Sequence, residues 1–166
     1  FSQVIKLFGD AQLNQPFHQI FVAKVNEGVI GYVAFSLKFL KSASGISGYI
    51  IARLAVSAQH QKQGVGSQLV RTGIDVLPKK GADVLQVYGD PAYYRRFGFS
   101  EKTCSVFMPP YPLAYPFGRT GMMLTETSLP DTPIQLDLSP HYPNQVYGDE
   151  TLTNHSTITG QSLVNH

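Results

Sequence analysis

Cysteine and charge are both scarce in this sequence, and each shortage excludes a class of protein. Cys104 is the only cysteine in 166 residues, so neither a disulfide framework nor a cysteine-ligated zinc site can form within one chain. The five histidines form no HExxH pair, which excludes that type of metal-binding helix. Charged residues make up 14% of the chain and hydrophobic residues 43%, a composition too apolar for a wholly disordered protein.

Long apolar runs are also missing. None approaches the ~20 residues that a membrane-spanning helix needs, and no secretion signal is visible. We therefore expect a cytoplasmic protein with no membrane partner. The chain begins at Phe1, without a methionine and within what reads as a secondary-structure element, so an upstream segment is expected to be missing.

The charge that is present is unevenly distributed. The formal net charge of +2 gives no global argument for nucleic-acid binding. All 13 Lys and Arg residues lie in residues 1–127, which carry a net charge of +6, whereas residues 128–166 hold four acidic residues and no basic one. The basic part suits an anionic ligand. We expect one domain over residues 1–127 and an acidic tail over residues 128–166, extended or partly docked.

Hydrophobic periodicity predicts a chain that mixes strands and helices. Strands are expected at residues 18–25, 29–40, 49–56, 84–88 and 122–127, and helices at residues 1–8, 64–77 and 91–97. The strand, helix and strand between residues 49 and 88 form a βαβ unit, whose right-handed crossover implies parallel pairing. The fold class is therefore α/β (α+β).

Turn residues add detail to this pattern. The first two strands are expected to form an antiparallel hairpin, with Gly28 at positive φ in the turn between them. Asp90 is expected to cap the helix over residues 91–97. The proline-dense residues 109–116 cannot be regular structure. The alternation of apolar residues from Ile134 onward leaves open one short edge strand in the tail.

The clearest chemical signal is the segment QKQGVGS, residues 61–67, between a buried strand and a helix. A glycine-containing helix start presents unpaired N–H groups and the positive end of the helix dipole, which suits a phosphate or pyrophosphate. A Walker A loop does not fit, because no glycine here is followed by Lys-Ser or Lys-Thr. A GxGxxG fingerprint does not fit, because Leu69 stands where the third glycine is needed. The pattern [Q/R]xxGxG does fit, with Gln61 first. A glycine-containing helix start without a ligand is the alternative.

Two segments resemble one known family. Residues 54–70, LAVSAQHQKQGVGSQLV, resemble the acetyl-CoA loop of the GCN5-related N-acetyltransferase (GNAT) superfamily. Residues 89–99, GDPAYYRRFGF, resemble its second signature, a short helix that carries a tyrosine and ends in Gly-Phe. The sequence of residues 89–99, together with the proline-rich segment that follows, is similar to the YhbS-like branch of this superfamily. The resemblance covers roughly residues 19–127 and implies a mixed central sheet with a splayed pair of parallel strands and flanking helices.

The resemblance also implies how acetyl-CoA would be held as a co-substrate. The strand over residues 49–56 would diverge from residues 84–88, and the backbone of Leu54 and Val56 would pair with the pantetheine arm. Backbone N–H groups of the loop would hold the pyrophosphate. The loop residues concerned are Gln61, Lys62, Gln63, Gly64, Val65, Gly66 and Ser67.

The implied chemistry is direct attack of an amine on the acetyl thioester. Tyr94 would donate a proton to the departing thiolate, and the Val56 N–H would polarise the thioester carbonyl. The alternative for Tyr94 is a packed aromatic residue. The general base stays open between His18, Asp90 and a chain of water molecules, because residues 49–57 contain no acidic side chain.

Two functions of different classes remain after these arguments. One is an acetyl-CoA-dependent N-acetyltransferase with an unidentified amine acceptor. The other is a non-catalytic GNAT-fold module that binds acyl-CoA and regulates a partner. Neither needs a metal or a nucleic acid, and a homodimer is left open. We expect Cys104 to be a buried, inert thiol and His60 to pack or cap. Arg95 and Arg96 are expected on a solvated helix face, with contacts to phosphates as the alternative.

Overall fold

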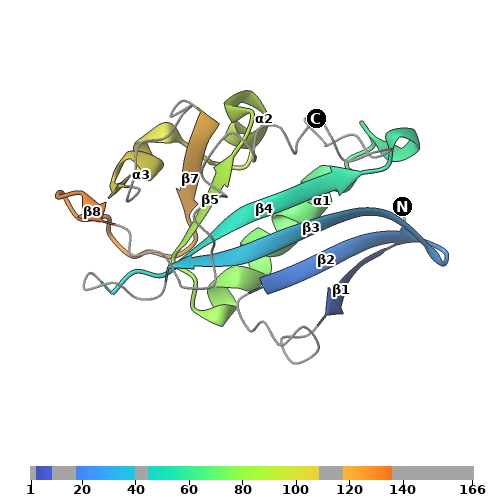
Figure 1. Ribbon diagram of the computed structural model, residues 1–166, viewed down its shortest axis with the longest axis horizontal. Helices are drawn as coiled ribbons and strands as arrows, with labels where there is room; N and C mark the ends of the chain where they lie inside the picture. The colour runs from blue at the N-terminus through green and yellow to red at the C-terminus, as the bar shows by residue number, and fades with distance from the viewer. Residues whose placement is uncertain (1–2, 9–17, 40–44, 109–117, 136–166) are drawn as a thin grey trace.

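A mixed sheet of six strands forms the centre of the computed structural model, which describes residues 3–8, 18–39, 45–108 and 118–135 (Figure 1). The strand order is β1-β2-β3-β4-β5-β7. The strands are β1 (Gln3–Phe8), β2 (His18–Val25), β3 (Gly28–Phe39), β4 (Gly48–Val56), β5 (Val84–Tyr88) and β7 (Arg119–Met123). The fold class expected from the sequence is therefore confirmed.

Antiparallel pairing joins β1 through β4, and β5 to β7, whereas β4 and β5 are parallel. The crossover between these parallel strands is α1 (Val65–Val76), followed by the 3₁₀ turn η2 (Leu77–Lys80). Pro78 lies in this 3₁₀ turn, and Gly81 then closes it with a left-handed φ of 88°. Every residue of β5 is buried, as a strand between two neighbours in a covered sheet requires.

The main core lies between the sheet and α1, which packs behind β2, β3 and β4 in the view of Figure 1. Leu69 and Val70 of α1 have no exposed surface. Phe35 of β3 is also fully buried, and its ring lies against Gly73 of α1. This contact fixes the height of the helix over the sheet.

Two short helices flank the other end of the sheet. They are α2 (Pro91–Arg95) and α3 (Glu101–Ser105), and α3 packs against β7. A two-residue strand, β6 (Phe107–Met108), pairs in parallel with β8 (Ile134–Gln135). Ile134 and Phe107 join Ile46 and Val84 in a small second core. Residues just beyond the expected domain boundary therefore pack on the body, while residues 136–166 lie outside the described part.

The helix expected at residues 1–8 was wrong, because the structure has β1 there. Val4 and Ile5 face Ala23 and Val22 of β2 across an antiparallel ladder. Five of these eight residues are apolar, and with Leu7 the odd positions Phe1, Ile5 and Leu7 also suit the two-residue period of a strand, while Val and Ile favour strands. Pairing with the free edge of β2 favours the strand over the helix. The sequence of residues 1–8 alone carries no information about that edge.

Three other expectations need correction. In the β2–β3 turn the left-handed residue is Asn26, with φ 50°, while Gly28 already pairs with Val25 as the first residue of β3. The last strand of the main sheet lies at Arg119–Met123, earlier than expected, and α3 was not foreseen. The proline-dense residues 109–116 lie outside the described residues.

Candidate functional site

Strands β4 and β5 separate before β4 ends. Their parallel ladder runs from the pair Gly48–Val84 to the pair Ile51–Val87 and then stops. Strand β4 continues to Val56, paired only with β3 on its other side within the described residues. A bulge at Ala52 accompanies this separation. The β5-facing edge of β4 therefore carries backbone groups without a neighbouring strand, as expected for a splayed parallel pair.

The N-terminus of α1 follows β4 after one loop and has no side-chain cap. Gly64 is the N-cap residue, with a left-handed φ of 85° that favours glycine. The first helical hydrogen bond runs from the Gln68 N–H to the Gly64 carbonyl, at 3.0 Å. The N–H groups of Val65, Gly66 and Ser67 have no acceptor among the residues that the structure describes. Such a helix start favours an anion.

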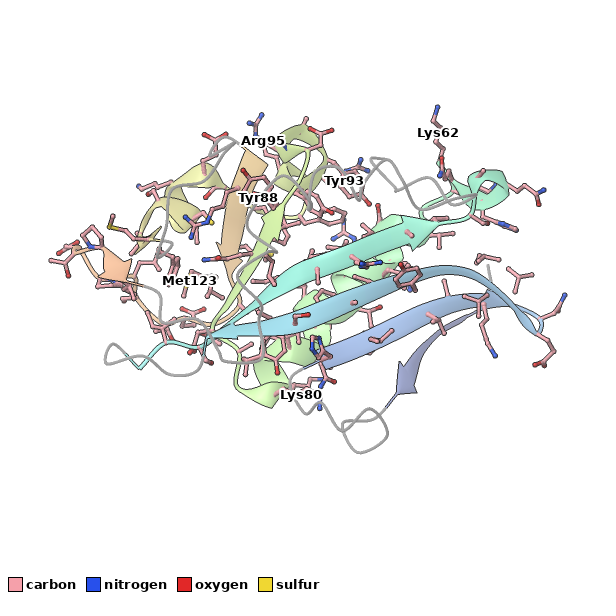
Figure 2. The ribbon with its side chains drawn as sticks, in the orientation of Figure 1. Lys62, Lys80, Tyr88, Tyr93, Arg95 and Met123 are labelled. Atoms are coloured by element: carbon pink, nitrogen blue, oxygen red, sulfur yellow. The ribbon has the colours of Figure 1, made fainter. Side chains whose placement is uncertain are left out.

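Side chains of the loop tie it back to the end of β4. Gln61 donates from Nε2 to the Val56 carbonyl at 3.2 Å. His60 lies with Nδ1 2.7 Å from Ser57 Oγ, a side-chain contact within the turn. Lys62 is exposed with a left-handed φ of 58°, and its side chain projects outward in Figure 2. The Gln61 side chain therefore holds the loop against the end of β4. The backbone N–H groups of the loop stay available for the predicted ligand contact.

Tyr94 lies in a cluster of aromatic rings between α2 and the sheet. Its ring centroid is 4.9 Å from that of Tyr93 and 5.5 Å from that of Phe99, and only 4% of Tyr94 is exposed. Gly89, directly after β5, leaves room for it, since a Cβ there would lie 3.0 Å from Tyr94 Cε2. Burial raises the pKa of Tyr94, and Tyr93 and Asp90 add to this effect. The phenol therefore keeps its proton at neutral pH and can only donate it.

Tyr93 was not singled out in the sequence, yet it joins α2 to the start of α1. It is 2% exposed, and its hydroxyl lies beside the Ser67 side chain. Burial raises the pKa of Tyr93, while Ser67 and Arg96 oppose that shift. The only available signal was the Tyr-Tyr pair itself, because its partner lies 26 residues earlier in the chain.

The pattern of an acetyltransferase (GNAT) domain matches residues 16–101. The chain belongs to the GNAT acetyltransferase family. It is 43% identical over 79 residues to the uncharacterized N-acetyltransferase YhbS of Escherichia coli K12, covering 47% of each chain. It is 38% identical over 85 residues to YjhQ of the same organism, covering 51% of this chain and 47% of YjhQ. The aligned part thus spans about half the length of these curated relatives.

Solved GNAT structures agree with this assignment. The crystal structure of Escherichia coli YhbS in complex with CoA has a TM-score of 0.62 and 28% identity, covering 81% of this chain and 69% of that one. A GNAT acetyltransferase from Brucella melitensis in complex with acetyl-CoA has a TM-score of 0.52 and 28% identity, covering 74% and 66%. The resemblance to the YhbS-like branch is confirmed.

The two acid–base candidates of this GNAT chain occupy different places. Asp90 accepts a hydrogen bond from the Ala92 N–H at 3.0 Å, so its carboxylate caps α2 as expected. His18 lies on β2 with Nδ1 2.8 Å from Ser36 Oγ of β3. Ser36 faces Ile50 of β4 in the ladder, so His18 is two strands from β4, or roughly 10 Å at the usual strand spacing.

Two further polar side chains of the GNAT domain, Cys104 and Arg119, lie around α3. Cys104 is a buried free thiol on α3. Arg119 of β7 donates to the Phe107 carbonyl, which holds the end of α3. Burial lowers the pKa of Arg119, and Cys104 and Tyr88 oppose this shift. In the described ranges no group of three His, Cys, Asp or Glu side chains could hold a metal ion, and no helix is long and apolar enough to cross a membrane.

Proposed function

We propose that this chain is an N-acetyltransferase that transfers the acetyl group of acetyl-CoA to an amine by direct attack. One observation carries the proposal: β4 loses its β5 neighbour at Ile51–Val87 and leads directly to the uncapped start of α1. An exposed strand edge and an anion-binding helix start therefore lie in sequence, one after the other. Acetyl-CoA offers matching chemistry, with amides along its pantetheine arm and a pyrophosphate beyond them.

The proposed binding mode uses backbone groups throughout. The pantetheine amides pair with Leu54 and Val56 on the free edge of β4, as an added strand would. The pyrophosphate lies on the loop over residues 61–67, where the N–H groups of Val65, Gly66 and Ser67 have no other acceptor in the described chain. The net charge of +6 on residues 1–127 attracts the anionic cofactor from a distance.

The proposed chemistry needs three proton or charge contacts at the thioester. The Val56 N–H polarises the acetyl carbonyl as negative charge develops on its oxygen. Tyr94, which is protonated at neutral pH, donates its proton to the CoA sulfur as the carbon–sulfur bond breaks. The amine forms the new carbon–nitrogen bond and loses its proton to a base.

The general base that accepts the amine proton has three candidates, which are Asp90, His18 and water. The Asp90 carboxylate already accepts the Ala92 N–H, so its role as a cap accounts for it. His18 lies beyond direct reach of a thioester held by β4, and it can act only through intervening water. A water chain that ends at His18 joins two of the three original candidates. The domain boundary at residue 127, a homodimer and a cytoplasmic location stay predictions.

Isothermal titration with acetyl-CoA tests the proposed site. Gly66→Val places a branched side chain where the backbone is to approach the pyrophosphate, and we expect at least a tenfold loss of affinity, because each charge-assisted hydrogen bond to phosphate is worth roughly 1.5–3 kcal/mol. Thr72→Val puts the same side chain on α1 two turns from its start and should leave affinity unchanged. Circular dichroism checks that both variants fold.

Release of CoA in the presence of a panel of amines tests the catalytic part. Turnover with any amine supports the transferase. Tight acetyl-CoA binding without turnover on any amine would favour the non-catalytic regulatory module instead. Unchanged acetyl-CoA affinity in folded Gly66→Val protein would contradict the assignment of the loop.

A further inference from the structure

Two guanidinium groups, one from α1 and one from the residue after α2, lie near the ring of Phe97. The Arg96 guanidinium carbon lies 4.3 Å from the centroid of the Tyr93 ring and 5.7 Å from that of Phe97. The Arg71 guanidinium carbon, on α1, lies 5.1 Å from the Phe97 centroid. Two cations from different helices therefore share the Phe97 ring. We expected Arg96 on a solvated face, and it is exposed, but its head group is held in place.

No carboxylate neutralises this pair. Within the described ranges neither Arg71 nor Arg96 makes an ion pair, although Asp75 is one helical turn from Arg71. Like charges repel, and contacts with aromatic faces at exposed sites offset only about 0.5–1 kcal/mol each. Two adjacent cations without a counter-ion are a favourable place for an anion.

The guanidinium pair adjoins the uncapped start of α1. Ser67 and Arg71 are four residues apart on α1, so they share one helix face about 6 Å apart along the axis. The Tyr93 hydroxyl lies beside Ser67 while the Tyr93 ring carries the Arg96 guanidinium. Arg71, one helical turn from Ser67, and Arg96, over the ring of Tyr93, are therefore the cations linked to the helix start.

We propose that Arg71 and Arg96 hold the 3′-phosphate on the ribose of CoA, as a second anion subsite beside the pyrophosphate loop. This inference rests on the proposed function, because it assumes that the loop binds the pyrophosphate. CoA carries a phosphomonoester one ribose away from its pyrophosphate, and this pair of arginines lies about one helical turn from the loop. Guanidinium groups bind phosphate oxygens through two parallel hydrogen bonds.

Contacts with the aromatic rings hold the arginine side chains of the subsite in fixed conformations. Arg96 also donates from Nε to the Tyr93 carbonyl at 3.1 Å, which fixes its plane and leaves its terminal nitrogens to bind the phosphate. Side chains that are already ordered lose less rotamer freedom when the phosphate arrives. Arg95, the residue before Arg96 and the last of α2, makes no cation–π contact within the described chain and projects away on the outer side of α2 in Figure 2. It is the matched control.

The test compares CoA with 3′-dephospho-CoA, which differ only in this phosphate. By titration calorimetry the unaltered chain should bind CoA about tenfold or more tightly than 3′-dephospho-CoA. The double variant R71Q/R96Q should lose most of this preference and keep its affinity for 3′-dephospho-CoA, while R95Q should keep the preference. Glutamine retains much of the aliphatic stem, and thermal melts verify folding. R96K retains charge but not the fork, and should keep part of the preference.

Three results would overturn the 3′-phosphate subsite at Arg71 and Arg96. Equal affinity of the unaltered chain for both ligands overturns the 3′-phosphate subsite and leaves the acetyl-CoA site standing. Binding of neither ligand removes the proposed function and this inference together. A preference that survives in R71Q/R96Q, or that R95Q abolishes equally, assigns the phosphate to other groups.

Discussion

Replacing Gly73 by alanine should destabilise the protein, against the usual trend for helices. In an ordinary helix interior, glycine to alanine gains up to about 1 kcal/mol, because alanine loses less backbone entropy on folding. Here an added Cβ would lie 2.0 Å from Cζ of Phe35 and 2.6 Å from its Cε1. Both residues are buried and the Phe35 ring is fully enclosed, so the ring cannot swing into solvent.

The overlap must be relieved by moving α1 away from β3 or by forcing the ring from its preferred rotamer. Overpacking of this kind costs typically 1–3 kcal/mol. The helix gain of up to about 1 kcal/mol offsets part of this cost and leaves a net loss of up to about 2 kcal/mol. For a chain of this size each kcal/mol corresponds to roughly 2–4 °C, so we expect the Tm of Gly73→Ala to fall by up to roughly 8 °C. Thermal unfolding followed by circular dichroism measures this shift.

A double-mutant cycle identifies the cause. Phe35→Leu removes the far end of the ring, and Gly73→Ala should cost less in that background than alone. The variant Thr72→Ala, next to Gly73 but partly exposed, should change the Tm little. A Tm for Gly73→Ala above that of the unaltered chain would show that α1 can shift freely over the sheet, and would refute the packing argument.

Three further changes test the site and the tail. Tyr94→Phe keeps the ring packing and removes the proton donor, so kcat should fall about tenfold or more while the acetyl-CoA Kd barely moves; unchanged kcat in steady-state kinetics would make Tyr94 a packing residue. Asp90→Ala removes the cap of α2 and should cost about 1 kcal/mol in urea unfolding, whereas Asp90→Asn should cost little. Removing residues 151–166 should leave the Tm nearly unchanged in calorimetry, and a large loss would show that they are docked.

Local chemistry made some elements predictable. The strands at residues 18–25 and 84–88 were expected with the bounds that the structure has, because each is rich in β-branched or aromatic residues and ends at turn residues. The α2 helix followed from Asp90 and Pro91 in the same way, and its cap is present. The loop sequence also predicted a helix start that favours an anion.

What the sequence could not supply depends on contacts between distant segments. β1 exists because β2 offers it an edge, and α3 is too short for any helical period to show. The divergence of β4 from β5 came only through the family resemblance, since no residue type marks where a ladder stops. The contacts of Tyr93 with Ser67 and of Arg71 with the Phe97 ring were missed, because each joins residues that are far apart in the chain.

The five-residue helix α2 has a consequence for which changes this chain can accept. Tyr93 points to the first turn of α1, and Tyr94, the next residue, fills the space left by Gly89 at the end of β5. Successive helical residues are about 100° apart, so one short helix faces both places at once. Inserting or deleting a single residue between Asp90 and Tyr93 would turn both side chains away together. Evolution can therefore exchange side chains along α2, but it cannot readily alter the helix's length.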